Sequence, residues 1–65
     1  MDAKKIGKKL VELRGEKQRE QVALDLGISY PSLVNYELGI RVPRDEIKLR
    51  ICEYYNIDFV ELFLM

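Results

Sequence analysis

Apolar residues recur at helical spacing along this chain, in short runs that end at glycine or proline. Ile6, Leu10 and Leu13 stand at i, i+4 and i+7, so they form one face of a helix expected over residues 2–16, with Asp2 as its cap. No stretch shows the convincing period-two alternation of a strand. The pattern therefore predicts an all-α fold of short helices.

Residues with special backbone properties separate the next helices. A helix over residues 19–26 is followed by Gly27, which can adopt the positive φ of a tight turn. Ser29 is expected to cap a third helix, because Pro31 then falls in the first turn, where its missing N–H is not needed. Gly39 ends that helix.

Two further helices complete the chain. Pro43 closes a loop, and a fourth helix is expected over residues 44–55. Asp58 and Glu61 then have the spacing of a capping box at the start of a fifth. A chain of 65 residues has room for one domain. We therefore expect one compact five-helix domain over residues 1–65.

The composition excludes several classes of function. The chain has no histidine and a single cysteine, Cys52, which excludes an internal disulfide, a Cys/His zinc site and a Ser-His-Asp triad. No phosphate-binding glycine loop or nucleophile–base pair is present, so we expect neither an enzyme nor a bound cofactor or metal. Without a long apolar run or a signal peptide, we expect a cytoplasmic protein with no membrane partner.

Charge is unevenly distributed, although the formal net charge is zero. Residues 1–19 carry seven cations against three anions, whereas residues 20–65 carry four cations against eight anions. One end of the chain could therefore face a polyanion. Because affinity for nucleic acid depends on the few cations that face phosphates, a neutral total does not exclude such a partner.

Residues 19–39 have the features of two helices that cross at a steep angle. Ala23 is the small residue expected at the crossing, and Gly27 supplies the turn. The apolar positions that flank them are Val22, Leu26, Ile28, Leu33 and Tyr36. This arrangement is typical of a helix-turn-helix.

With these residues the chain resembles the Cro/CI-type helix-turn-helix regulators, also described as XRE-like and lambda-repressor-like. The resemblance covers nearly the whole chain, with the helix-turn-helix at about residues 19–38. The residues that carry it are Leu13, Arg14, Val22, Ala23, Leu26, Gly27, Ile28, Ser29, Tyr36, Glu37, Gly39, Val42, Pro43 and those from Asp58 to Phe63. The resemblance implies a five-helix DNA-binding domain whose third helix enters the major groove.

The resemblance also implies roles for individual residues. The base-reading positions would be Tyr30, Pro31, Ser32, Val34 and Asn35. Asn35 is the strongest of these, because an amide can bind adenine through two hydrogen bonds. The phosphate contacts would come from Arg19, Arg41, Arg44 and, more weakly, Lys17. Arg14 and Glu37 would form a structural ion pair.

The chain departs from the family pattern at several positions. Arg19 replaces the usual glutamine, Gln18 replaces the usual Ser or Thr cap, and Leu38 replaces an asparagine. Pro31 and Val34 make the reading face unusually apolar, and Val34 is either a base contact or an ordinary surface residue. These departures leave the operator sequence open.

The last ten residues, 56–65, are rich in apolar side chains, and one small domain can bury only part of them. The residues expected at a dimer interface are Phe59, Leu62, Phe63, Leu64 and Met65. A two-fold dimer would match a palindromic operator.

We therefore expect a homodimeric, sequence-specific regulator of transcription that binds double-stranded DNA. Its expected mode is repression by operator occupancy, in a protein of prophage, mobile-element or bacterial type. An alternative stays open, in which the same fold is a protein-interaction adaptor or an antitoxin-like module. The neutral charge, the apolar Pro31 and Val34 face and the hydrophobic C-terminal segment support that alternative.

Overall fold

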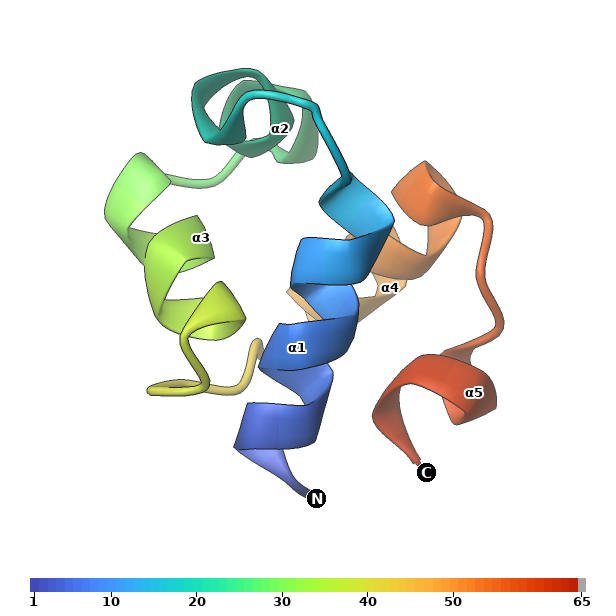
Figure 1. Cartoon of the computed structure of the whole chain (residues 1–65). Helices are drawn as coiled ribbons and strands as arrows, with labels where there is room; N and C mark the ends of the chain where they lie inside the picture. The colour runs from blue at the N-terminus through green and yellow to red at the C-terminus, as the bar shows by residue number, and fades with distance from the viewer. Residues whose placement is uncertain (65) are drawn as a thin grey trace.

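The computed structural model describes residues 1–64, and this part of the chain forms five α-helices around one core (Figure 1). The helices are α1 (Ala3–Arg14), α2 (Arg19–Leu26), α3 (Tyr30–Glu37), α4 (Asp45–Tyr55) and α5 (Phe59–Phe63). Figure 1 shows α1 in the centre, with α3 on one side and α5 on the other, and both termini at the same end. The all-α, five-helix prediction is confirmed.

Three helices begin at the caps that the sequence predicts. Asp2 Oδ1 accepts hydrogen bonds from the backbone N–H groups of Lys4 (3.1 Å) and Lys5 (3.2 Å). Ser29 Oγ accepts one from the N–H of Ser32 at 3.2 Å. Asp58 caps α5 in the same manner, through the N–H groups of Val60 and Glu61. In each helix a side-chain oxygen satisfies N–H groups that the first turn leaves without a backbone partner.

The turn between α2 and α3 depends on Gly27. Its φ of 71° and ψ of 34° lie in the left-handed region, which glycine reaches without strain. The N–H of Ile28 then donates back to the carbonyl of Ala23 at 3.0 Å, which closes the end of α2. This turn sets the direction in which α3 leaves α2.

Side chains from all five helices meet in one hydrophobic core. Its buried members are Ile6, Leu10, Val22, Ala23, Leu26, Leu33, Tyr36, Ile47, Ile51, Leu62 and Phe63. Helix α1 packs against α3 and α5, while α2 packs against α3 and α4. The core therefore fixes the positions of α2 and α3 relative to each other, while their outer faces stay exposed.

The C-terminal helix contributes more to this core than the sequence suggested. Leu62 and Phe63 are 0% and 1% exposed, which corrects their assignment to a dimer interface, because both side chains are used within the chain. Val60 and Leu64 are each 58% exposed, and Phe59 is half-buried. Met65, also assigned to the interface, lies outside the described residues.

Candidate nucleic-acid interface

Helix α3 is buried on one side only. Leu33, Tyr36 and Glu37 face the core, and at 100° per residue the opposite side belongs to Pro31 and Asn35. Pro31 is exposed and Asn35 is partly exposed. The face that an incoming partner would meet first therefore carries one apolar ring and one amide.

The remaining predicted base-reading residues lie on the two flanks of α3. Ser32 is on the flank next to Tyr36, while Tyr30 and Val34 are on the flank next to Glu37. Tyr30 is 44% exposed, and Ser32 and Val34 are partly buried. All five predicted residues thus lie along the accessible surface of one helix.

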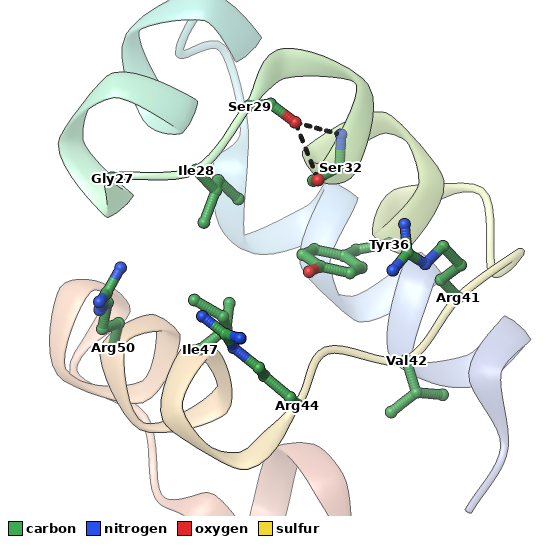
Figure 2. Close-up of a pocket in the computed structure, with 10 residues that line it drawn as sticks. All are labelled: Gly27, Ile28, Ser29, Ser32, Tyr36, Arg41, Val42, Arg44, Ile47 and Arg50. Carbon is green, nitrogen blue, oxygen red and sulfur yellow. Dashed lines mark hydrogen bonds between the residues drawn. The ribbon is translucent and has the colours of Figure 1, made fainter.

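The hydroxyl of Ser32 is oriented by its neighbour. Ser29 Oγ donates to Ser32 Oγ at 2.8 Å (Figure 2). Because this bond uses Ser32 as an acceptor, the proton of Ser32 remains available to an outside acceptor. The residue that caps α3 therefore also leaves the Ser32 hydroxyl available as a donor at the N-terminal end of the helix.

A groove of about 490 Å³ runs between α3 and the start of α4 (Figure 2). Its lining residues are Gly27, Ile28, Ser29, Ser32, Tyr36, Arg41, Val42, Arg44, Ile47 and Arg50. Arg41 comes from the loop after α3, and Arg44 is the N-cap residue of α4. Two of the predicted phosphate contacts therefore lie at one groove beside the reading helix.

Arg50 is a third arginine of this groove, and the sequence analysis missed it. Its guanidinium donates to the carbonyl of Leu26 at 3.2 Å and to Glu46 Oε1 at 2.7 Å. It therefore connects α4 to the turn before α3. The spacing was the signal, because Arg44 and Arg50 each stand three residues from Ile47, on either side of this buried position of α4.

Arg19, on the other side of α3, is paired with a buried carboxylate. Its Nε lies 2.7 Å from Glu37 Oε1, and Arg14 Nε lies 2.8 Å from Glu37 Oε2. The hydrogen bond to Glu37 raises the pKa of Arg19 above its ordinary value. Because Nε makes this bond, the two terminal amino groups of Arg19 can still donate to a phosphate. The Arg14–Glu37 ion pair that the resemblance implies is present, and Arg19 shares it.

Lys17 is engaged elsewhere. Its Nζ lies 3.3 Å from the hydroxyl of Tyr54 and 4.8 Å from the centre of that ring. The ammonium group therefore lies against α4, where Tyr54 in turn donates to Asp25 of α2 at 2.7 Å. These contacts stabilise the packing of α2 on α4 and compete with a phosphate role for Lys17.

Residues 1–64 hold neither a metal-ligating cluster nor a membrane-spanning helix. No cluster of three or more His, Cys, Asp or Glu residues in that part of the chain could hold a metal ion. None of the described helices is long and apolar enough to cross a membrane.

A short helix, a left-handed turn and a second helix with an accessible outer face define a helix-turn-helix domain. The model of the helix-turn-helix family matches residues 8–62, and the chain therefore belongs to this family, in its XRE and Cro/CI-like form. Proteins of this kind are DNA-binding regulators of transcription, and so is this one. No curated protein and no solved structure shows significant similarity to the chain.

Proposed function

We propose that this protein is a sequence-specific repressor that binds a palindromic operator as a homodimer in the cytoplasm. Repression would follow from occupancy, because a dimer on the operator excludes polymerase or another regulator. The protein would be a repressor of prophage, mobile-element or bacterial type.

The observation that carries this proposal is the arrangement of donors around α3. Asn35 stands on the outer face, where its amide can bind a base edge. Arg19 lies on one flank, and Arg41 and Arg44 lie on the other. A helix in the major groove is bordered by a phosphate backbone on each side, so cations on both flanks suit this geometry.

The exposed apolar residues of the C-terminal segment support the homodimer. Val60 and Leu64 are each 58% exposed, next to the half-buried Phe59. We propose that these three residues, with Met65, form a two-fold interface in place of the buried Leu62 and Phe63. A closed dimer would place two copies of α3 about one DNA turn apart, at roughly 34 Å.

Selection from a random library of double-stranded DNA tests the function directly. The selection is run at about physiological salt, because specific and non-specific binding separate there. We expect enrichment of an inverted repeat whose half-sites are spaced by about one helical turn. The enriched site can then be tested for repression of a promoter that contains it.

The selection also separates the competing hypotheses. Enrichment of a single half-site would contradict the homodimer and leave the DNA-reading role in place. If folded protein enriched no sequence, the repressor proposal would fail, and the domain would be treated as an interaction module for another protein.

A further inference from the structure

The carboxylate of Glu46 forms ion pairs with two of the three groove arginines, Arg44 and Arg50. One oxygen of its carboxylate lies 2.7 Å from Arg50 Nη2, and the other lies 3.9 Å from Arg44 Nη2. The side chain of Glu46 is 60% exposed, and those of Arg50 and Arg44 are 43% and 75% exposed. An anion that bridges two guanidinium groups therefore already sits at the edge of the groove.

A phosphate would use the same donors. Guanidinium groups bind phosphate and carboxylate through the same planar arrangement of N–H donors. The groove adds Arg41, which makes no ion pair within residues 1–64, and the free hydroxyl proton of Ser32. The groove therefore offers a DNA phosphate more donors than Glu46 uses.

We propose that Glu46 is an internal competitor for the DNA phosphate that binds in this groove. The inference rests on the proposed function, since it assigns this groove to the DNA backbone. Before DNA binds, the carboxylate of Glu46 pairs with the guanidinium groups of Arg44 and Arg50. When DNA binds, a phosphate replaces this carboxylate. Exposed ion pairs are weak, so Glu46 can be displaced by rotation of its own side chain.

The competition lowers affinity without changing which sequence is preferred. Phosphate contacts carry no sequence information, so Glu46 weakens binding to every duplex by the same factor. A regulator with this carboxylate spends less time on any DNA, the operator included, and its ratio of specific to non-specific affinity is unchanged. Glu46 is therefore a determinant of the strength of DNA binding, whereas Asn35 is assigned to its specificity.

The test compares Glu46→Gln with Glu53→Gln on a random-sequence duplex. Both substitutions remove one negative charge from an exposed position of α4, but Glu53 makes no ion pair or side-chain hydrogen bond within the described residues. We expect Glu46→Gln to bind roughly three- to tenfold more tightly than the unmodified chain. The slope of log K against log salt should steepen by about one unit. Glu53→Gln should change affinity by less than about twofold, because its charge is screened.

A second variant assigns the gain to the arginines. In Glu46→Gln/Arg50→Gln the freed guanidinium is absent, so we expect most of the gain in affinity and in salt slope to disappear. Urea unfolding of each variant shows whether the fold is retained. Glu46, Arg50 and Glu53 are all exposed, so we expect each variant to fold. Binding is measured at a temperature well below the unfolding midpoint of each variant.

Several results would overturn the inference. If the unmodified chain bound DNA but Glu46→Gln behaved like Glu53→Gln, the inference alone would fail. If the unmodified chain bound no DNA, the proposed function would fail as well. Tighter binding of inorganic phosphate by Glu46→Gln at constant ionic strength, with no gain for the duplex, would assign the groove to a free anion and reject the DNA role.

Discussion

Gly7 lies where α1 crosses the end of α3. A Cβ at this position would lie 2.5 Å from the carbonyl oxygen of Glu37 and 2.8 Å from that of Tyr36. Both atoms belong to the backbone, so neither can move without shifting α3. This contact explains a glycine in the middle of a helix, where the helical preference alone favours alanine by about 1 kcal/mol.

Gly7→Ala should therefore destabilise the protein. The added methyl group forces α1 and α3 apart, and overpacking of this kind costs about 1–3 kcal/mol, more than the helical preference returns. We expect the free energy of unfolding in urea to fall by a net ~1–2 kcal/mol. Lys5→Ala, at an exposed position of α1, is the control and should stay within about 0.5 kcal/mol. A more stable Gly7→Ala would contradict the close approach.

Tyr55 carries a buried hydroxyl that lacks a hydrogen-bond partner among the described residues. Burial raises its pKa from 10.0 to about 12. The folded state therefore favours the neutral phenol, and this contribution is fully present below pH 10 and is lost as the pH rises toward 12. The hydroxyl is a polar group that folding removes from water without compensation.

Tyr55→Phe should accordingly be neutral or stabilising. Removing the unpaired hydroxyl relieves a desolvation cost of about 1 kcal/mol. We also expect a smaller loss of stability between pH 10 and 12, measured by urea unfolding across that range. Tyr54→Phe is the contrast, because its hydroxyl donates to Asp25 at 2.7 Å and its removal should destabilise. Destabilisation by Tyr55→Phe would mean that the hydroxyl has a partner.

Three helices are joined through one carboxylate. Glu37, at the end of α3, accepts from Arg14 at the end of α1 and from Arg19 at the start of α2, and its side chain is 0% exposed. A buried charge of this kind is tolerated because both of its oxygens are paired. The same bonds set the position of the first turn of α2 relative to α3.

Substitutions in this cluster should lower the free energy of unfolding by amounts that follow a defined order. Glu37→Gln leaves two arginines without their anion, and breaking a buried pair costs about 3–5 kcal/mol. Arg14→Gln should cost less, and Arg19→Gln least, because the Arg19 side chain is 35% exposed and the Arg14 side chain 14%. Urea unfolding of the three variants measures the order. If Arg19→Gln were the most destabilising of the three, the burial of the ion pairs with Glu37 would not explain the stability of this cluster.

A substitution in α3 should change sequence specificity, whereas one in the loop after α3 should change affinity for all sequences. Asn35→Ala removes a potential bidentate base contact, so we expect discrimination at one base step to relax by about 1–3 kcal/mol. Arg41→Ala should instead weaken binding to all sequences and flatten the salt slope by about one unit. Competition binding with the selected operator and its single-base variants measures both. Unchanged sequence preference in Asn35→Ala would reject this reading face.

The protein as a whole has an uneven surface. Residues 51–65 carry three anions, Glu53, Asp58 and Glu61, and no cation, and this C-terminal segment exposes Val60 and Leu64. Such a surface suits a protein partner or solvent better than a phosphate backbone. It favours a second copy of the chain at the C-terminal segment and DNA at the outer face of α3.

Val60→Lys/Leu64→Lys should therefore give a folded monomer. Both side chains are exposed, so the fold should be retained, while charges of one sign would face each other across a two-fold interface. If the proposed dimer forms through these residues, we expect sedimentation to show a dimer for the unmodified chain and a monomer for the variant at the same concentration. Operator affinity should fall with it. Leu24→Lys, also at an exposed apolar position, is the matched control, and equal behaviour of the two variants would place the interface elsewhere.

The helices and the turn were predictable because their causes are local. The caps Asp2, Ser29 and Asp58 bind N–H groups two or three residues away, and the positive φ of Gly27 is a property of that residue. The family follows from the same short-range pattern of apolar, small and turn residues. Predictions of this kind need no knowledge of which helices pack together.

Contacts between distant residues depended on how the helices pack. Glu37 joins Arg19 across 18 residues, and Gly7 meets a backbone that the sequence places 30 residues away. The burial of Leu62 and Phe63 likewise reflects their place beneath α1 and α4. An apolar side chain looks the same in a sequence whether it fills a core or faces a partner. Only the packed helices show which of these positions are already occupied, because burial is a property of the surroundings of a side chain.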